Sequence, residues 1–402
     1  MSDPKPAVDG GALRSLLRES HLLSADQLGS AVADRSRLLG AREAVVYIVD
    51  YAQDVLVPLP DDRGPRHEPQ PVDGSDVGRA FRRVEVLLSS GPDGGTVQRL
   101  PLLDGGERVG VLEVVWDQPP AGDREEEIRA FAALVAELVV TRSLSSDVFD
   151  RLRRRRPLSL AAEIQWELLP PLTFVTEHVV ITGLLEPAYQ IGGDTFDYAV
   201  NGDTADLIVL DAMGHGLPAA LLAGAALGAY RHTRRAGRSL AEISAAMDAI
   251  IAENFRESRF ATALLARLDL PTGRFSWVAA GHPAPLLVRD GALVHPSACT
   301  SSLPLGLQRE PAVECETWLQ TGDRVLLYTD GVVEARSADG QFFGEERLAE
   351  FVVRAEAAGD SPPETLRRLM RSVMEHQAGR LQDDASIVLV EWRTGREQQV
   401  NV

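Results

Sequence analysis

Four short signatures containing aspartate lie in the second half of the chain, each where an apolar run meets a glycine or a polar turn. They are Gly192-Gly193-Asp194, Asp211-Ala212-Met213-Gly214-His215-Gly216, Thr329-Asp330-Gly331 and Asp383-Asp384-Ala385-Ser386. Carboxylates gathered without cysteine or clustered histidine favour hard cations such as Mg²⁺ or Mn²⁺. The sequence therefore predicts a metal-dependent enzyme.

The elements that carry the first two signatures are predicted to be the arms of a β-hairpin. The runs 196–200 and 204–210 are strand-like, and Asn201-Gly202 between them is the favoured two-residue turn. With that turn, Asp194 lies opposite Val209, and Asp211 becomes its diagonal neighbour on the same face, with Cβ atoms roughly 7–8 Å apart. Two carboxylates at that distance can share two metal ions about 3.5–4 Å apart. The alternative is that both are ordinary turn aspartates, which are common.

The other two signatures repeat this arrangement. Asp330 follows the strand-like run 325–329, and Asp383 and Asp384 lead into the run 387–390. Carboxylates buried together at strand ends repel one another unless a cation neutralises them. Four converging aspartates therefore predict metal binding better than any one of them.

Composition excludes several classes of protein. The chain has 402 residues, 59 acidic and 41 basic, and a net charge of −18, which argues against nucleic-acid binding. Two cysteines, Cys299 and Cys315, are too few for a disulfide framework, have no metal-ligand spacing, and indicate ordinary packing in a reducing compartment. The N-terminus does not resemble a signal peptide, and the apolar stretch 212–230 is too short and glycine-rich to span a bilayer. We expect a cytoplasmic protein that does not contact a membrane.

Residues 11–141 mix strand-like and helical segments. The runs 44–49 and 109–116 are β-rich, and 128–140 has helical periodicity. This order, closed by Gly110-Val111-Leu112-Glu113-Val114, resembles a GAF domain, which is a small α+β sensory module. The resemblance implies regulation by a small-molecule or protein signal, and the sequence leaves both open.

Residues 142–172 are predicted to be a linker helix with a break at Pro157 and an end at Pro170-Pro171. The segment contains the arginine-rich run 151–156. That run is either a solvated helix face or part of a linker that pairs in a homodimer and transmits a signal.

Residues 173–393 alternate strands and helices and contain all four signatures. Ser239–Glu242 and Ser361–Glu364 fit capping boxes, and Pro271-Thr272-Gly273 and Asp290-Gly291 fit hairpin turns. The predicted helices are 217–235 and 240–255, and the predicted strands include 262–270, 274–280, 285–289, 324–329 and 386–391.

Five motifs in this region occur in a recognisable order. They are Gly-Gly-Asp-x-x-Asp (192–197), Asp-Ala-Met-Gly-His-Gly (211–216), Ala-Gly-His-Pro-Ala-Pro (280–285), Tyr-Thr-Asp-Gly-Val-x-Glu-Ala (328–335) and Asp-Asp-Ala-Ser (383–386). The chain from about 160 to 391 resembles the SpoIIE/RsbU-type branch of the metal-dependent protein phosphatases, the PPM or protein phosphatase 2C-like superfamily.

The resemblance implies an αββα sandwich with two Mn²⁺ or Mg²⁺ ions at one edge. Asp211 matches the carboxylate that bridges both metals, and Ala212 the position that contributes a backbone carbonyl. Asp194 matches the ligand of one metal, and Asp330 and Asp383 match the ligands of the other. Asp384 and Asp197 remain supporting candidates, because Asp384 matches a position that is less often a direct ligand and the role of Asp197 is open.

The resemblance also implies an activity and a partner. A water bridging the metals would attack phosphoserine or phosphothreonine, and the substrate would be a phosphorylated STAS-domain anti-sigma-factor antagonist. Two other readings stay open. One is a catalytically silent phosphatase-like scaffold, and the other is a diguanylate cyclase, suggested by Gly192-Gly193-Asp194-Thr195-Phe196. The cyclase motif has a carboxylate where this chain has Thr195, and the other four motifs have no place in a cyclase.

Three further side chains near these motifs have two interpretations each. His215 is either a general acid or phosphate contact or a structural loop residue. For His282 we expect packing within a turn rather than metal binding, and for Glu334 a structural role. No basic side chain equivalent to the phosphate-binding arginine of eukaryotic relatives is evident.

Overall fold

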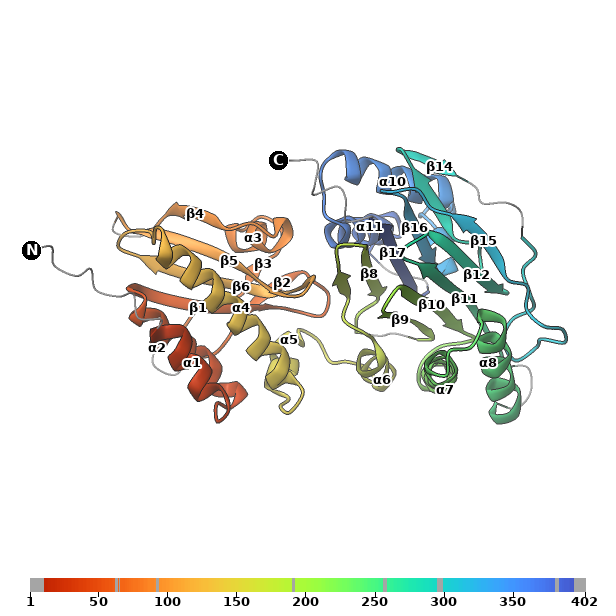
Figure 1. Cartoon of the computed structure of the whole chain (residues 1–402), viewed down its shortest axis with the longest axis horizontal. Coiled ribbons are helices and arrows are strands. Elements are labelled where there is room, and N and C mark those ends of the chain that lie inside the picture. The colour runs from red at the N-terminus through yellow and green to blue at the C-terminus, as the bar shows by residue number, and fades with distance from the viewer. Residues whose placement is uncertain are drawn as a thin grey trace, which may run out of the picture. The chain divides into compact units, whose positions relative to one another are not determined.

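The computed structural model describes residues 11–61, 64, 66–91, 94–189, 192–255, 259–294, 299–379 and 383–393. The chain falls into two compact units, Met1–Arg156 and Pro157–Val402 (Figure 1). Among the described residues, none of the helices combines the length and the apolar character needed to cross a bilayer.

A six-stranded antiparallel sheet forms the centre of the N-terminal unit, in the order β3-β2-β1-β6-β5-β4. Its strands are β1 (Ala41–Val49), β2 (Val55–Pro58), β3 (Gln70–Pro71), β4 (Leu87–Ser90), β5 (Thr96–Asp104) and β6 (Glu107–Trp116). Its helices are α1 (Gly11–Ser20), the 3-10 helix η1 (Ala25–Gln27), α2 (Leu28–Leu38), α3 (Asp76–Arg83), α4 (Asp123–Ser143) and α5 (Val148–Arg153). The β-rich runs and the helix predicted from the sequence lie within β1, β6 and α4.

Alternating side chains of β1 supply two separate cores in this unit. Val46 and Ile48 pack in the core that α1, α2 and α4 cover. Val45 and Tyr47 point the other way and pack with Phe81 of α3. Figure 1 shows α3 on the opposite side of the sheet from α1 and α2. The unit is therefore a three-layer α+β structure, because successive side chains of a strand point to opposite faces and both faces of β1 are covered.

The segment 142–172 is not one linker helix. Helix α4 continues to Ser143, α5 ends at Arg153, and α6 (Leu160–Leu168) begins only after a non-helical stretch. Phe149 of α5 is buried in the core of the N-terminal unit, whereas Ala162 of α6 is buried in the C-terminal unit. Each half of the segment is thus held by a different core, and Pro157 lies at the division between the two units. The predicted end at Pro170-Pro171 is confirmed, since α6 stops at Leu168.

Two antiparallel sheets face each other in the C-terminal unit. The five-stranded sheet has the order β15-β12-β11-β10-β9, and the six-stranded sheet has the order β14-β13-β16-β17-β8-β7. The strands are β7 (Thr173–Val175), β8 (Val179–Glu186), β9 (Asp194–Asn201), β10 (Thr204–Ala212), β11 (Ala261–Asp269), β12 (Arg274–Ala280), β13 (Leu286–Arg289), β14 (Ala292–Val294), β15 (Cys315–Trp318), β16 (Arg324–Tyr328) and β17 (Ala385–Trp392). The remaining helices are α7 (Leu217–Arg235), α8 (Leu240–Asn254), α9 (Asp330–Val333), α10 (Glu345–Ala357) and α11 (Pro362–His376).

Helices cover the outer face of each sheet. Leu207 and Val209 of β10 point into the core between the sheets, and Ile208 and Leu210 point to the core shared with α7 and α8. Helices α10 and α11 enclose a further core on the six-stranded sheet. Figure 1 shows these two helix pairs on opposite sides of the paired sheets. The expected αββα sandwich is confirmed.

Local sequence accounts for several boundaries in this unit. The Ser239 hydroxyl accepts from the backbone N–H of Glu242, whose carboxylate accepts from the Ser239 N–H, so the predicted capping box is present. Asp290 and Gly291 both have positive φ in the turn between β13 and β14, as a type I′ hairpin requires. The capping box predicted at Ser361 is absent. The Ser361 hydroxyl makes no cap hydrogen bond, and the Glu364 carboxylate instead accepts two bonds from Arg367.

Cys299 and Cys315 form a disulfide, with Cα atoms 6.1 Å apart. The expectation of ordinary packing was therefore wrong. Cys299 lies 16 positions before Cys315, which is on β15 opposite Trp277. The inference of a reducing compartment rested on unpaired cysteines and loses that support.

Candidate metal centre

The hairpin β9–β10 sets Asp194 directly opposite Asp211. Asn201 pairs with Thr204, so the turn is Gly202-Asp203 and the predicted turn, Asn201-Gly202, was wrong by one position. Gly202 has a φ of +56° at the first central position, the place that a type II′ turn reserves for glycine. This slip moves the register by two residues and keeps both aspartates on one face. Directly opposite residues have Cβ atoms about 4.5–5.5 Å apart, closer than the predicted diagonal pair.

The Gly192-Gly193 pair lets two backbones approach the aspartates. A Cβ on Gly193 would lie 2.2 Å from the carbonyl oxygen of Ala212, so only glycine fits beside that carbonyl. The N–H groups of Gly192 and Gly193 both donate to Asp384 Oδ2, the second over 2.8 Å. Asp384 therefore holds the turn that leads into Asp194.

Thr329 joins the two sheets at this edge. Its hydroxyl donates to Asp194 Oδ2 over 2.6 Å and accepts from the Ser386 N–H over 2.9 Å. Thr329 is fully buried, and it directly precedes Asp330 at the end of β16. The hydroxyl thus fixes a carboxylate of the five-stranded sheet to the strand ends of the six-stranded sheet.

The carboxylates lie close enough to raise one another's pKa. Burial, followed by the charges of Asp330, Asp383 and Asp384, raises the pKa of Asp211 to about 7. Burial and the charge of Asp211 raise the pKa of Asp194 well above its usual value. Burial and the charge of Asp383 raise that of Asp330. The leading causes in all three cases are desolvation and other carboxylates, which is the electrostatic setting of a cation site.

Donor type and charge both fit a divalent cation. Carboxylate and carbonyl oxygens from the edges of both sheets meet here, and hard cations prefer such donors. Among the described residues, no three acidic, histidine or cysteine side chains are already gathered at ligand spacing. Asp194, Asp211, Asp330, Asp383 and the Ala212 carbonyl therefore suit a cation in chemistry and charge without forming a closed ligand set.

Asp197 lies outside this group of carboxylates. Its buried carboxylate accepts from Arg231 Nε and Nη2, over 3.1 and 2.9 Å, and from Arg234 Nη1 over 2.9 Å. Arg231 also donates to the carbonyl oxygen of Leu168 at the end of α6. The second aspartate of Gly-Gly-Asp-x-x-Asp is thus occupied in joining β9 to α7 and α6.

His215, His282 and Glu334, whose roles the sequence left open, differ in how far they are buried. His215 is exposed in the loop before α7. His282 is buried, its Nδ1 lies 3.2 Å from the Pro283 carbonyl oxygen, and desolvation lowers its pKa to about 4. Glu334 is exposed, and its N–H donates to the Asp330 carbonyl. Packing of His282 in a turn agrees with the expectation, and His215 keeps both interpretations.

The contact between Thr329 and Asp194 is a feature of this edge that the sequence does not predict. The signature Thr329-Asp330-Gly331 contains this threonine, but a threonine at the end of a strand has no distinctive chemistry. Only the pairing of β16 with β17 and the meeting of the two sheets reveal its contact with Asp194.

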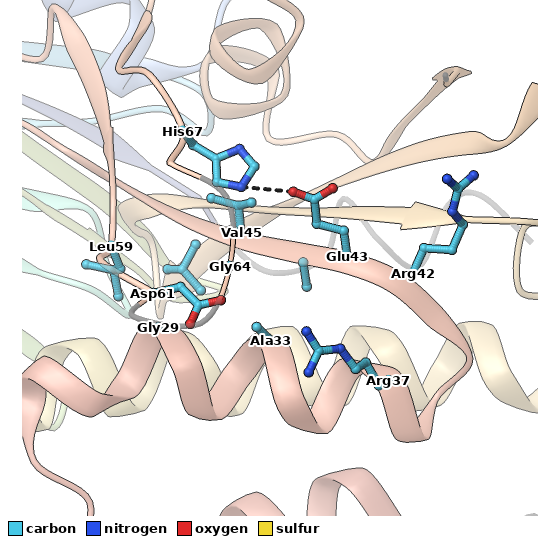
Figure 2. Close-up of a pocket in the computed structure, with 12 residues that line it drawn as sticks. Gly29, Ala33, Arg37, Arg42, Glu43, Val45, Leu59, Asp61, Gly64 and His67 are labelled. Atoms are coloured by element: carbon cyan, nitrogen blue, oxygen red, sulfur yellow. Dashed lines mark ion pairs between the residues drawn. The ribbon is translucent and has the colours of Figure 1, made fainter. Parts of the chain in front are cut away.

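A separate pocket lies in the N-terminal unit between α2 and β1 (Figure 2). Its volume is about 160 Å³. Its lining includes the apolar side chains of Ala33, Val46 and Leu59, and Arg37 lies at one end on α2. His67 Nε2 lies 2.9 Å from Glu43 Oε1 at its side. This pocket combines apolar and charged lining within one unit.

Comparison with known proteins agrees with the motif order. Residues 201–393 match the family model described as stage II sporulation protein E (SpoIIE), a range that includes Asp211, Asp330 and Asp383 but begins after Asp194. Phosphoserine phosphatase RsbP of Bacillus subtilis is 27% identical over 249 residues, covering 60% of this chain and 59% of that protein. Phosphoserine phosphatase RsbU of the same organism is 23% identical over 234 residues, covering 58% of this chain and 69% of that protein. The chain thus spans less than two thirds of the length of RsbP.

Two solved structures are similar to part of the chain. The RsbU and RsbW domains of a Mycobacterium tuberculosis protein are 27% identical with a TM-score of 0.48, covering 56% of this chain and 63% of that one. The SiaA-PP2C domain of Pseudomonas aeruginosa is 23% identical with a TM-score of 0.49, covering 58% of this chain and 94% of that one. From the family match and the motif order, residues 201–393 form a SpoIIE-type phosphatase domain.

Proposed function

We propose that the chain is a metal-dependent protein serine/threonine phosphatase that acts on a phosphorylated regulatory protein. The observation that carries this proposal is the direct pairing of Asp194 with Asp211 at a sheet edge where Asp330 and Asp383 raise the pKa of Asp211. Buried carboxylates that raise one another's pKa are stabilised by bound cations. The relatives RsbP and RsbU, both named phosphoserine phosphatases, support the reaction class.

In this proposal two Mn²⁺ or Mg²⁺ ions are held by Asp194, Asp211, Asp330, Asp383 and the Ala212 carbonyl. When bound, such ions neutralise phosphoryl charge and lower the pKa of water toward neutrality. The protein's part is to place the ligands. Thr329 orients Asp194 through its hydroxyl, and Asp384 holds the Gly192-Gly193 backbone so that Asp194 enters the site. Gly193 keeps the Ala212 carbonyl accessible.

The test is Mn²⁺-dependent hydrolysis of p-nitrophenyl phosphate and of a phosphorylated STAS-domain protein encoded by the same organism. We expect Asp211→Asn to abolish turnover of both substrates while the far-ultraviolet circular dichroism stays that of the wild type. Full activity of this variant would contradict the metal assignment. The exposed Asp203 in the turn of the same hairpin supplies the matched control, Asp203→Asn, which should retain activity.

A catalytically silent scaffold is the second candidate. One observation favours it, namely that the described carboxylates are not already gathered at ligand spacing. A wild-type chain that binds the phosphorylated STAS protein but hydrolyses neither substrate with Mn²⁺ or Mg²⁺ present would establish the scaffold.

For the N-terminal unit we propose a GAF-like regulatory role, with the pocket between α2 and β1 as the place for a small-molecule signal. Its mixture of apolar and charged lining and its volume of about 160 Å³ suit a small polar molecule. The alternative is a protein signal. We further propose a homodimer, and light scattering that finds a monomer over a wide concentration range would refute it.

A further inference from the structure

Five exposed apolar side chains lie around the strand end that carries Asp211. They are between 38% and 53% exposed, and we call them the apolar rim: Met213, Leu217, Leu221, Leu303 and Leu307. Met213 follows Asp211 by two residues, and Leu217 and Leu221 are one helical turn apart at the start of α7. Leu217 and Leu221 lie off the buried face of α7, which consists of other residues, among them Ala219, Leu222 and Ala226.

Backbone pairing joins the two halves of the rim. Ala212 is the strand partner of Ala261, and the Met213 N–H donates to the Phe260 carbonyl over 3.0 Å. Ala261 in turn exchanges two hydrogen bonds with Leu305, of 3.0 and 2.8 Å. The exposed Leu303 and Leu307 each lie two residues from Leu305. The rim therefore continues from the loop after Asp211, across the end of β11, to the segment 303–307.

The segment 303–307 is held firmly against α8. Asp248 Oδ1 accepts from the N–H groups of Gly306, over 2.7 Å, and Gln308, over 2.9 Å. Gly306 has a φ of +93°, and a Cβ there would lie 2.6 Å from a methyl group of Ile251. An apolar surface on a fixed backbone loses little conformational entropy when a partner covers it.

The rim is also an uncharged region of a strongly acidic chain. Residues 212–230 contain no aspartate, glutamate, lysine or arginine, although the chain carries a net charge of −18. A phosphorylated partner brings further negative charge, which acidic surface would repel. Apolar contact beside the carboxylates can provide affinity without that repulsion.

We infer that the apolar rim docks the substrate as a folded protein whose phosphorylated side chain emerges from an apolar patch. The inference rests on the proposed phosphatase function and specifies the surface that would hold its substrate. A phosphoserine side chain is short, so a folded partner that places its phosphate at Asp211 must cover the residues directly beside it. Most of the binding energy of a protein interface comes from a few well-packed side chains near its centre, where water is excluded.

The test compares substrates of different size on one set of variants of the full chain. Leu221→Gln, Leu307→Gln and the double variant alter the rim without touching the carboxylates. Leu88→Gln is the matched control, because Leu88 is 57% exposed on β4 of the N-terminal unit. The substrates are p-nitrophenyl phosphate, the phosphorylated STAS protein and a short phosphopeptide with the sequence around its phosphoserine.

We expect the double variant to lower kcat/KM for the phosphorylated STAS protein by about tenfold or more, as losing interface anchors does. Turnover of p-nitrophenyl phosphate and of the phosphopeptide should stay within about twofold of wild type, and Leu88→Gln should change none of the three. An unchanged kcat/KM for the folded protein would overturn the inference. An equal loss of kcat/KM for the phosphopeptide would also overturn it. A gain in p-nitrophenyl phosphate turnover would overturn it as well, because it would show that another part of the protein or a second copy covers the rim.

A binding measurement separates this inference from the proposed function. Affinity for the phosphorylated STAS protein is measured by calorimetry with Asp211→Asn, with and without Leu221→Gln/Leu307→Gln. A loss of affinity caused by the rim substitutions supports docking even if the wild type hydrolyses nothing. Equal affinity of the two proteins refutes docking even if the wild type is an active phosphatase.

Discussion

Asp211 is a half-buried carboxylate whose neighbours are other carboxylates, and partial burial together with their charges raises its pKa to about 7. In an unfolded chain the same group has a pKa near 3.8. Between these values the folded protein keeps a proton that the unfolded chain has lost, so the contribution of Asp211 to stability falls as pH rises through this window. Without a cation, ionised Asp211 therefore lowers the stability of the folded protein at neutral pH.

Replacing Asp211 by asparagine should remove this cost. We expect Asp211→Asn to raise the melting temperature of chelator-treated protein at pH 8 and to leave it nearly unchanged at pH 4, because asparagine cannot ionise. Added Mn²⁺ should stabilise the wild type at pH 8 more than the variant. Thermal unfolding at the two pH values measures this, with Asp203→Asn as the control. A variant less stable than wild type at pH 8 in chelator would contradict the electrostatic account.

Substitutions of Thr329 test whether its hydroxyl sets the orientation of Asp194. Thr329→Val keeps the shape of the side chain but leaves Asp194 Oδ2 and the Ser386 N–H without this partner. We expect a loss of roughly 1–3 kcal/mol in the free energy of unfolding and a roughly tenfold to hundredfold weaker response to Mn²⁺. Thr329→Ser, which retains the hydroxyl, should recover most of both. Equal Mn²⁺ titrations for the valine variant and wild type would exclude this role.

At the scale of elements, the junction of β9, α6 and α7 is held by a buried ion pair. Asp197 lies three residues from Asp194 on β9, and Arg231 and Arg234 reach it from α7. The same Arg231 binds the last turn of α6 through the Leu168 carbonyl. The strand that carries a candidate ligand is thereby fixed to two helices.

Removing the charge of Asp197 should destabilise the unit without abolishing its metal dependence. We expect Asp197→Asn to lower the free energy of unfolding by up to about 3–5 kcal/mol, because two arginines lose a buried anionic partner. Denaturant unfolding measures the loss, and Mn²⁺ titration of the remaining activity should give an unchanged half-saturating concentration. Asp147→Asn, at an exposed pair with Arg151, should have little effect. If Asp197→Asn lost the Mn²⁺ dependence of its activity but kept the wild-type free energy of unfolding, Asp197 would be a metal ligand instead.

At the scale of the whole molecule, the chain consists of two units with separate cores that divide at Arg156–Pro157. The stretch between α5 and α6 is non-helical, and Arg155 and Arg156 are exposed within it. Cores that share no residues can unfold separately. The two units are therefore expected to remain folded after the chain between them is cut.

Limited trypsin digestion should cut after Arg154 or Arg155 and yield two resistant fragments, while the Arg156–Pro157 bond resists the enzyme. Mass spectrometry identifies the fragments, and the C-terminal fragment should show the Mn²⁺-dependent rise in melting temperature of the intact chain. Rapid digestion of either fragment to small peptides would show that its core depends on the other unit.

The order of the motifs, through the family resemblance, implied the αββα sandwich. The sequence by itself pointed to the candidate ligands Asp194, Asp211, Asp330 and Asp383 and predicted most strand and helix boundaries. These follow from local patterns, since periodicity, turn residues and aspartates at strand ends are properties of short segments. Tertiary structure decided what depends on pairing between distant segments. The strand register places the hairpin turn at Gly202-Asp203. Asp384 accepts hydrogen bonds from the Gly192-Gly193 backbone, and Asp197 accepts them from the arginines of α7. Thr329 donates a hydrogen bond to Asp194. Tertiary structure also divided the expected linker helix between two cores and joined Cys299 to Cys315. A local pattern carries no information about which distant group will contact a side chain once the sheets pack. In this protein those contacts decide what each of these side chains does.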